Sequence, residues 1–251
     1  MRGVSGGREL EGYVAIVTGS ARNIGRAIAL ELADAGATIA VHARTSRQDG
    51  EEVVCEIEAR GGRAKLFLAE LTDPKAVASL IDAVKSEFGR IDILVNNAVM
   101  RGDAPIEEIT YDAWRKVLAS ILDSAFLCSQ AALPHLTESG RGAIVSIAGV
   151  AAHTGIEGRA HVVTAKTGLI GLTRALSAEL AGRNITVNCV SPGYMNTKRD
   201  HVPPHFLARP VPMKRPGEPE EIATAVRFLC GPGARYVTGQ AIQVSGGWHI
   251  G

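Results

Sequence analysis

The chain has 251 residues and a formal net charge of +1, because 27 Lys and Arg nearly balance 26 Asp and Glu. This balance excludes recognition of nucleic acid or of a membrane surface through bulk charge. The first residues lack the apolar core of a signal peptide, and no run reaches the roughly 18 apolar residues of a membrane span, so we expect a cytoplasmic protein. The 4 cysteines lie far apart and show no metal-ligand pattern, which predicts free thiols and no metal site.

Strand-like and helix-like patterns alternate along the whole chain. Short apolar runs predict strands at residues 13–18, 38–41, 64–68, 91–95, 143–147, 185–190 and 241–244. Helical spacing predicts helices at residues 24–35, 48–60, 74–88, 111–136, 159–181 and 219–230. Uninterrupted apolar strands between helices are typical of a parallel sheet that is covered on both faces. The pattern predicts an α/β fold over residues 1–251, a single doubly wound Rossmann-type domain with a mostly parallel seven-stranded sheet and helices on both faces.

Two segments interrupt this rhythm. Residues 195–219 hold six of the 11 prolines, so they cannot form a regular helix or strand. Because loops beyond the carboxyl ends of parallel strands often carry specificity, we expect this segment to be a substrate flap. Residues 1–10 are expected to be flexible.

A glycine-rich turn follows the first strand and opens the first helix. The segment from Thr18 to Gly25 reads Thr-Gly-Ser-Ala-Arg-Asn-Ile-Gly. Gly19 permits a tight bend, and Gly25 permits close packing of helix on strand. The helix N–H groups then face a pyrophosphate. Asn23 stands at a position that favours glycine, and asparagine is the best replacement where φ is positive. The predicted nucleotide contacts in this turn are Gly19, Ser20, Arg22, Asn23, Ile24 and Gly25.

The end of the second strand indicates which nucleotide is bound. An NAD-binding site needs a carboxylate there to accept from the ribose hydroxyls, but this chain has Ala43 followed by Arg44. Arg22 lies in the nearby turn, and two guanidinium groups can bind a 2′-phosphate with no acidic side chain opposing them. The sequence therefore predicts NADP(H) in preference to NAD(H). The alternative is that both arginines are solvated surface charges.

Further motifs follow in order along residues 10–250. They are Glu70-Leu71-Thr72-Asp73, Asn96-Asn97-Ala98-Val99, Pro192-Gly193 with Thr197, Tyr236-Val237-Thr238-Gly239-Gln240 and Ser245-Gly246-Gly247. Together with the glycine turn, they resemble the short-chain dehydrogenase/reductase family, of the 3-oxoacyl-carrier-protein reductase type. The resemblance implies that Glu70 and Leu71 lie against adenine, and that Asn97 and Ala98 line the nucleotide site. It further implies that Pro192, Gly193 and Thr197 hold the nicotinamide carboxamide, and that Lys166 binds the nicotinamide ribose.

The same resemblance implies a catalytic asparagine, serine, tyrosine and lysine, of which only the lysine is present. Counting along the family pattern puts Ile121 at the asparagine, Gly149 at the serine and Val162 at the tyrosine, while Lys166 remains. A shift of register does not restore the tyrosine, because the chain has none between Tyr111 and Tyr194. Loss of general acid catalysis slows a reaction by roughly 10²–10⁴-fold.

Histidine is the best candidate for a replacement acid. His161 precedes Val162 and lies about 100° round the predicted helix. We take His161 and Lys166 as the candidate catalytic residues, with a partly exposed or interface position as the alternative for His161. For His153, a partly exposed or interface position is the favoured interpretation.

Three functions fit these residues. The first is an NADP-dependent oxidoreductase with a remodelled site, acting on a small-molecule substrate. The second is an inactive nucleotide-binding pseudoenzyme or partner subunit, and the third is a non-redox enzyme that reuses the pocket. Small and apolar residues on the helices at 111–136 and 159–181 resemble the family's intersubunit four-helix bundle, so we expect a homodimer or homotetramer.

Overall fold

The computed structural model describes residues 7–100, 102–197 and 210–250. Within these residues, seven strands form one sheet in the order β3-β2-β1-β4-β5-β6-β7, and every neighbouring pair is parallel. The strands are β1 (Val14–Val17), β2 (Thr38–Ala43), β3 (Arg63–Leu68), β4 (Ile93–Asn96), β5 (Ala143–Ile147), β6 (Thr186–Pro192) and β7 (Ala241–Val244). The predicted α/β fold with a seven-stranded parallel sheet is confirmed.

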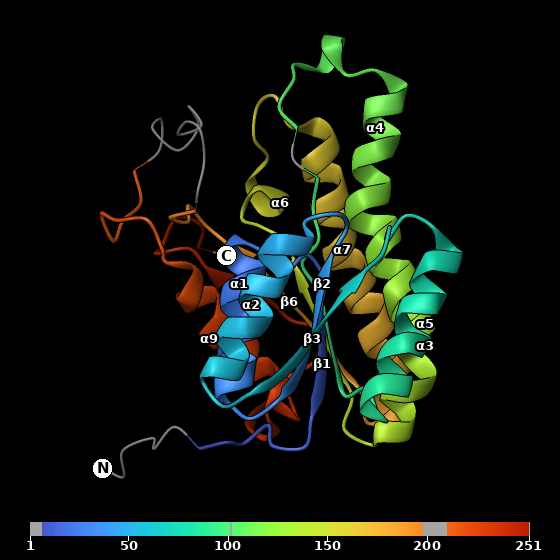
Figure 1. The fold of residues 1–251 in the computed structure, drawn as a ribbon. Coiled ribbons are helices and arrows are strands. Elements are labelled where there is room, and N and C mark those ends of the chain that lie inside the picture. Colours follow the sequence, from blue (N-terminus) through green and yellow to red (C-terminus); the bar gives the residue numbers. More distant parts are fainter. Residues whose placement is uncertain (1–6, 101, 198–209, 251) are drawn as a thin grey trace.

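Helices cover both faces of the sheet (Figure 1). One face carries α1 (Asn23–Asp34), α2 (Arg47–Ala59) and α9 (Pro219–Cys230). The other carries α3 (Pro74–Phe88), α4 (Tyr111–Leu118), α5 (Ser124–Ser139) and α7 (Ala160–Leu180). The short α6 (Ala151–Thr154) precedes α7, and single 3₁₀ turns lie at Ile106–Glu108, Ala181–Arg183 and Pro232–Ala234.

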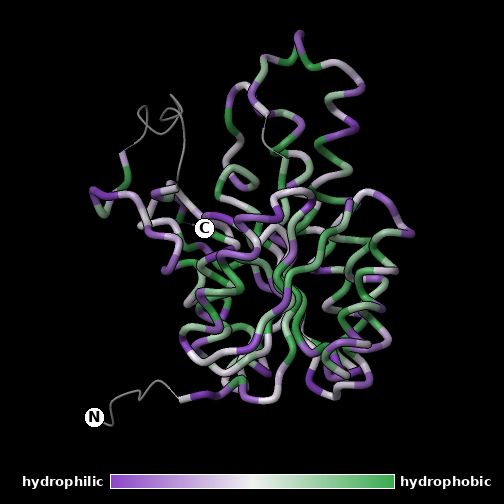
Figure 2. Tube along the Cα trace, in the orientation of Figure 1, coloured by the Kyte–Doolittle hydropathy of each residue, from purple (hydrophilic) through white to green (hydrophobic). Residues whose placement is uncertain are grey.

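Each central strand supplies two cores, because successive side chains point to opposite faces of a sheet. In β1, Ala15 and Val17 enter the core shared with α1, α2 and α9, whereas Val14 and Ile16 enter the core shared with α3 and α5. Figure 2 shows the hydrophobic trace concentrated along the sheet and the inner sides of the helices. Burial on both faces explains why the strands read as continuous apolar runs.

The helix predicted over residues 111–136 is not continuous. A π-helical turn, Ala119–Asp123, separates α4 from α5. Ser120 and Ser124 donate side-chain hydrogen bonds back to the carbonyls of Val117 (3.0 Å) and Ser120 (2.8 Å), which competes with regular helical bonding. Such turns widen the helix by one residue and often mark functional sites. Hydrophobic spacing alone cannot show this change of helical pitch.

The stretch Tyr111–Ser139 is apolar enough to cross a membrane by length and composition, with a mean hydropathy of 1.4 over its best window. The sequence-based expectation that no run reaches the length and apolar character of a membrane span was therefore too strong. In the structure, α5 packs against β4, β5 and α3. This position is that of a core helix in a soluble domain.

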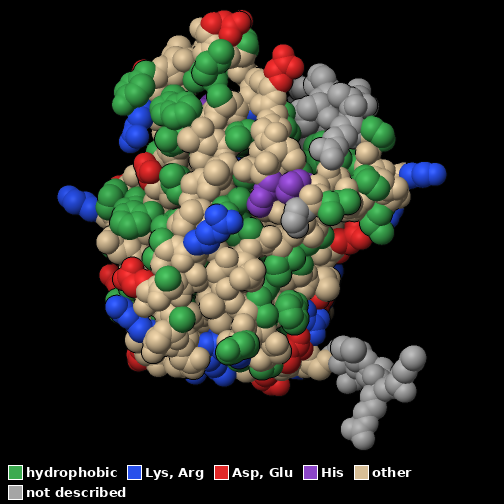
Figure 3. All heavy atoms as spheres, turned by 180° about the vertical axis from the view of Figure 1, so that it is seen from behind, with side chains coloured by type: hydrophobic (Ala, Val, Ile, Leu, Met, Phe, Trp, Pro, Cys, Tyr) green, Lys and Arg blue, Asp and Glu red, His purple; other side chains and the backbone are tan. Residues whose placement is uncertain are grey.

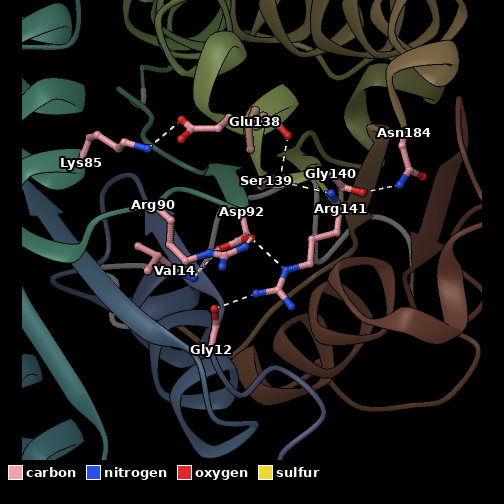
Figure 4. Close-up of polar contacts among 12 residues, drawn as sticks. Gly12, Val14, Lys85, Arg90, Asp92, Glu138, Ser139, Gly140, Arg141 and Asn184 are labelled. Atoms are coloured by element: carbon pink, nitrogen blue, oxygen red, sulfur yellow. Dashed lines mark hydrogen bonds and ion pairs between the residues drawn. The ribbon is translucent and has the colours of Figure 1, made fainter.

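A buried carboxylate joins strands at the amino edge of the sheet, opposite the glycine turn. Asp92 is fully buried and accepts two hydrogen bonds from Arg90, one from Arg141 Nε (3.0 Å) and one from the Val14 N–H (2.9 Å), as Figure 4 shows. The hydrogen bonds that Arg90 donates to Asp92 hold the pKa of Arg90 above its ordinary value. Four donors satisfy the charge, so Asp92 links the starts of β1, β4 and β5.

The expected flap and N-terminus are only partly described. Residues 198–209, which include Pro203 and Pro204, and residues 1–6 lie outside the described residues. The described part of the flap has no helix or regular strand before α9, apart from a single bridge between Met195 and Gly217. At the N-terminus, Leu10 is buried and Glu9 forms an ion pair with Arg227, so this part of the segment expected to be flexible is packed against the domain.

Candidate functional site

The glycine-rich turn lies at the carboxyl end of β1, where the strand order reverses. The crossover after β1 leads to β2 on one side, whereas β4 pairs with β1 on the other. In open α/β sheets, the crevice at this reversal is the usual ligand site. Gly19 has φ +63° and Asn23 has φ +50°, so asparagine adopts the left-handed backbone predicted for it.

The packing of the turn leaves no room for a side chain at Gly25. A Cβ built there would lie 2.3 Å from the Gly19 carbonyl oxygen and 2.5 Å from Asn97 Nδ2. Both distances are well inside van der Waals contact. Close packing of α1 against the end of β1 therefore depends on glycine at this position, as the sequence predicts.

The N-terminus of α1 is built to receive an anion. Its N-cap residue, Arg22, makes no side-chain capping hydrogen bond, and the first turn of α1 carries no acidic side chain. The first backbone N–H groups of a helix lack intrahelical partners and carry a partial positive charge. An uncapped end beside two left-handed residues fits a dinucleotide pyrophosphate.

Asn97 shapes this turn from the neighbouring strand end. Its Nδ2 donates to the carbonyls of Thr18 (2.9 Å) and Gly19 (3.1 Å). Thr18 Oγ1 accepts from the backbone N–H groups of Asn97 (2.9 Å) and Ala98 (3.0 Å) and donates to the Val95 carbonyl. Sequence analysis predicted Asn97 and Ala98 to line the nucleotide site, and in the structure both contact the glycine-rich turn.

His42 belongs to this site although sequence analysis did not select it. Its Nδ1 accepts a hydrogen bond from the Gly19 N–H at 3.0 Å, and its Nε2 lies 3.1 Å from the Ala69 carbonyl. The ring is buried at the end of β2, and burial lowers its pKa. A single ionisable residue in the strand Thr-Ile-Ala-Val-His-Ala was the available signal.

Both arginines expected at the 2′-phosphate already pair with carboxylates. Arg22 Nη2 lies 2.5 Å from Oδ2 of Asp49 on α2, and Arg44 Nη1 lies 3.8 Å from Glu70 Oε2. The expectation that no acidic side chain opposes them is therefore wrong, because residues distant in sequence meet at this edge. Glu70 also accepts from the backbone and hydroxyl of Thr72, and Leu71 is buried.

Val162 and Lys166 lie one helical turn apart in α7, so they share a face. Lys166 is buried and donates from Nζ to the carbonyl of Ile147, the last residue of β5. This contact fixes the ammonium group at the carboxyl edge of the sheet. The structure thus brings Lys166 to the same edge as the glycine turn.

The neighbours of Val162 are apolar. Val162 packs against a cluster made of Val117, Ile121, Ala125, Ala165 and Leu169. Ile121 is 1% exposed and lies in the π-helical turn. At Gly149, a Cβ would find its nearest neighbour, the Pro192 carbonyl oxygen, at 3.9 Å, so this position has space for a side chain. The positions matched to asparagine, serine and tyrosine offer no hydroxyl, phenol or amide.

His161 points to a different part of the site from Val162. It is 3% exposed, and its Nε2 would lie 3.0 Å from a Cβ built on Gly102, in the loop after β4. Among the described residues, none forms a hydrogen bond with its Nδ1. A buried imidazole with an unsatisfied nitrogen is an available proton donor or acceptor.

His153 lies away from this cluster. Its Nε2 is 3.1 Å from Ser191 Oγ and 2.9 Å from Gln243 Nε2, and its ring stacks on His249 at 5.1 Å. Burial lowers the pKa of His153, and the neighbouring His249 and Arg174 lower it further. These contacts agree with a partly exposed polar side chain.

The remaining predicted residues lie where β6 ends. Pro192 is its last residue, and Gly193 donates its N–H to the Val244 carbonyl (3.0 Å). A Cβ on Gly193 would lie 2.7 Å from the Ser245 Cα, so β6 and β7 approach closely here. Thr197 is the last described residue before the gap.

Of the cysteines, Cys128, Cys189 and Cys230 are buried and Cys55 is exposed, and all four are free. Burial raises the pKa of Cys128 to about 12 and that of Cys189 to about 11, so neither is a thiolate at neutral pH. In the part of the chain that the structure describes, no three His, Cys, Asp or Glu side chains gather as metal ligands would.

Comparisons with known proteins cover almost the whole chain. Residues 19–249 match the family described as enoyl-(acyl carrier protein) reductase. The 3-oxoacyl-(acyl-carrier-protein) reductase FabG of Staphylococcus aureus is 38% identical over 241 residues, covering 94% of this chain and 98% of the relative. The corresponding reductase of Synechocystis is 38% identical over 240 residues, covering 95% and 97%.

Solved structures give the same result. A short-chain dehydrogenase from Burkholderia cenocepacia, in complex with NADP, is 35% identical, with a TM-score of 0.90 over 96% of this chain and 100% of its own. A dehydrogenase/reductase from Sinorhizobium meliloti is 34% identical, with a TM-score of 0.92 over 98% of each chain.

Gly25→Ala tests whether the turn binds a nucleotide. The added Cβ would push α1 away from the Gly19 carbonyl, so we expect affinity for NADP⁺ to fall by at least about 100-fold, a loss of roughly 3 kcal/mol. Isothermal titration calorimetry measures the affinity. Gly182→Ala is the control, because a Cβ there meets nothing within 4 Å and the backbone of Gly182 is not left-handed. Unchanged NADP⁺ binding by the folded Gly25→Ala protein would contradict a nucleotide at this turn.

Proposed function

The chain belongs to the short-chain dehydrogenase/reductase family, and we propose that it is an NADP(H)-binding oxidoreductase with a remodelled catalytic site. One observation carries this proposal. The glycine turn and the uncapped N-terminus of α1, which suit a dinucleotide, lie at the carboxyl edge of the sheet. Lys166 and the apolar cluster that includes Val162 lie at the same edge. Binding of the nucleotide is retained in this proposal, whereas the family's proton donor is replaced.

The nucleotide-binding residues follow from the geometry of the sheet edge. The turn from Gly19 to Gly25 and the N-terminus of α1 would hold the pyrophosphate, and Lys166 would donate to the nicotinamide ribose. Leu71 would lie against the adenine, and the turn at Gly193 would lie against the nicotinamide. When bound, NADPH supplies the hydride. The NADP in the Burkholderia cenocepacia neighbour supports this choice of cofactor.

Preference for NADP(H) rests on Arg22 and Arg44. Both side chains are largely exposed, and exposed ion pairs contribute little stability, so a 2′-phosphate can draw the guanidinium groups from Asp49 and Glu70. When the guanidinium groups move to the phosphate, water solvates the two carboxylates that they leave, so neither carboxylate is buried without a partner. A bidentate contact with phosphate then favours NADPH over NADH.

Arg44→Gln tests this preference. Removing one charged contact to the 2′-phosphate should weaken NADPH binding by roughly tenfold and leave NADH binding unchanged. Fluorescence titration with each nucleotide measures both affinities. Arg60→Gln is the control, because Arg60 pairs with Asp34 and Glu56 at the far end of α2. Equal affinity of the wild-type protein for NADH and NADPH would contradict the preference.

The catalytic half of the site determines which acceptors it can reduce. Addition of hydride to a ketone leaves an alkoxide that needs a proton, whereas addition to an iminium ion leaves a neutral amine. Val162 and Ile121 present carbon atoms where a donor is expected, and they exclude water from that wall. We infer that iminium-type acceptors suit this site best.

His161 is the candidate acid for ketones. It is buried, its Nδ1 is unsatisfied among the described residues, and it adjoins the loop after β4. As general acid, the protonated imidazolium would give its proton to the alkoxide oxygen, and the neutral ring would then be reprotonated from water. Lys166 would orient the nicotinamide ribose from another face of α7.

The apolar cluster also favours a second function, that of a nucleotide-binding pseudoenzyme acting as a partner subunit. With no acid at Val162, tight NADPH binding without turnover is its signature. A non-redox enzyme that reuses the pocket is distinguished by activity that needs no added nucleotide.

Turnover with a cyclic iminium ion and with a matched cyclic ketone separates these functions. We expect NADPH oxidation with the iminium and slower oxidation with the ketone, measured at 340 nm. His161→Ala should lower ketone reduction by roughly 10²-fold and leave iminium reduction unchanged. His153→Ala should change neither rate. Tight NADPH binding with no turnover of either acceptor would contradict an active reductase.

Restoring the missing groups provides the complementary experiment. Gly149→Ser fits the space at this position, and combined with Val162→Tyr it supplies a hydroxyl and a phenol next to Lys166. Ketone reduction by the double variant should exceed that of the wild type by roughly 10²-fold.

We also propose that α4, α5 and α7 pair with a second copy of the chain in a homodimer or homotetramer. Along α7, Gly171, Ala175 and Ala178 form an exposed stripe of small side chains, which lets helices approach closely. Tyr111 and Phe126 expose hydrophobic rings on α4 and α5, and Figure 3 shows hydrophobic side chains on this side of the molecule. A homo-oligomer of the cytoplasm is the expected form, and a monomer in multi-angle light scattering would contradict it.

A further inference from the structure

The end of β2 contains a buried histidine where its other buried side chains are apolar. His42 is 2% exposed, and its Cα pairs with that of Phe67 in β3. A buried polar ring is stabilised only when its nitrogens are hydrogen-bonded. Both nitrogens of His42 have partners, and both partners are backbone groups at the carboxyl edge of the sheet.

These partners define which nitrogen carries the proton. The Gly19 N–H can only donate, so Nδ1 must accept and carry no proton. The Ala69 carbonyl can only accept, so Nε2 must carry the proton. His42 is therefore neutral in this arrangement. A second proton on Nδ1 would face the Gly19 N–H and break that hydrogen bond.

The backbone of His42 holds the same turn. Its N–H donates to Ser20 Oγ (2.9 Å), and its carbonyl accepts from the Ser20 N–H (2.9 Å). Gly19 is thus held by His42 from β2 and by Asn97 from the end of β4. These contacts fix the two peptide groups that lead into the N-terminus of α1.

We propose that His42 is a positioning residue of the nucleotide turn: its neutral imidazole holds Gly19 in the shape that binds NADP(H), and its protonation weakens that binding. The inference rests on the proposed function, since it concerns the same nucleotide. His42 does not touch the reacting atoms. It acts through Gly19 and through the turn that Gly19 begins.

The charged groups around His42 form ion pairs of opposite charge. Arg44 lies just beyond the end of β2 and pairs with Glu70, which lies just beyond β3. Arg22, in the turn, pairs with Asp49 on α2. Burial lowers the pKa of His42 by more than the hydrogen bond to the Ala69 carbonyl and the charge of Glu70 raise it, so the net direction is downward.

The direction of the pH effect follows from this burial. The ordinary pKa of histidine is 6.5, and that of His42 in the folded protein is lower. Above the ordinary value, the imidazole is neutral in both folded and unfolded chains, and its contribution is fully present. As the pH falls below 6.5 and through the lower folded pKa, the contribution is lost. NADP(H) affinity should therefore fall on acidification.

His42→Gln separates positioning from titration. A glutamine oxygen can accept from the Gly19 N–H, and its amide can donate to the Ala69 carbonyl, without titrating. Isothermal titration calorimetry with NADP⁺ from pH 8 to pH 5 should show wild-type affinity falling roughly tenfold more than that of His42→Gln. The 2′-phosphate also titrates, with a pKa near 6, but equally in both proteins, so the difference between the two profiles is the measured quantity.

Two further variants complete the experiment. His42→Leu should bind NADP⁺ at least about tenfold more weakly than the wild type at pH 8, because the Gly19 N–H loses its acceptor, and this difference should shrink as the wild type is protonated. His153→Gln, at a histidine outside the turn, should follow the wild-type profile. Circular dichroism at each pH confirms that every protein is folded.

Nitrogen-15 NMR of labelled His42 gives a readout that a purely structural role would not change. Nδ1 should show the shift of an unprotonated nitrogen at neutral pH and should titrate over the range in which affinity falls. Parallel binding profiles for wild type and His42→Gln, or wild-type affinity in His42→Leu, would overturn the inference. Absence of NADP⁺ binding by the wild type at all pH values would instead overturn the proposed function together with this inference.

Discussion

The hydrogen bonds between Thr18 and the Asn97 segment are the constraint on which the site depends. They join the carboxyl ends of β1 and β4, two neighbouring strands that are 77 or more residues apart in sequence at this point. A buried polar group that loses its partner costs about 1–3 kcal/mol, and this clamp satisfies several such groups at once. The turn, the uncapped end of α1 and the position of Gly25 all follow from where the clamp holds the backbone.

The two halves of the site are stabilised by different forces. The half that we propose to bind the nucleotide consists of backbone groups held by hydrogen bonds with Asn97 and His42. The half that we propose to be catalytic consists of apolar side chains, with Ile121 and Val162 in one cluster. Burial of apolar surface contributes roughly 25 cal/mol per Å², so this cluster stabilises the contact of α7 with the π-helical turn. Such a site can bind a nucleotide through its backbone groups, but its apolar side chains cannot transfer a proton.

Charged residues have different roles at the two edges of the sheet. At the amino edge, Asp92 is fully buried and fully hydrogen-bonded, so its network is part of the fold. At the carboxyl edge, Arg22 and Arg44 are exposed and form pairs that water screens. Exposed pairs can exchange partners at little cost, which suits the 2′-phosphate that we propose for this edge.

The sequence by itself determined the α/β fold with its parallel seven-stranded sheet, the glycine turn and the left-handed Asn23, because these depend on local pattern and on spacing along the chain. The tertiary structure alone decided the rest. It paired Arg22 with Asp49 and Arg44 with Glu70, divided one predicted helix by a π-helical turn, and placed the ring of His42 under Gly19. Those contacts join residues from separate strands and helices, and only the packing of the sheet brings them within hydrogen-bonding distance.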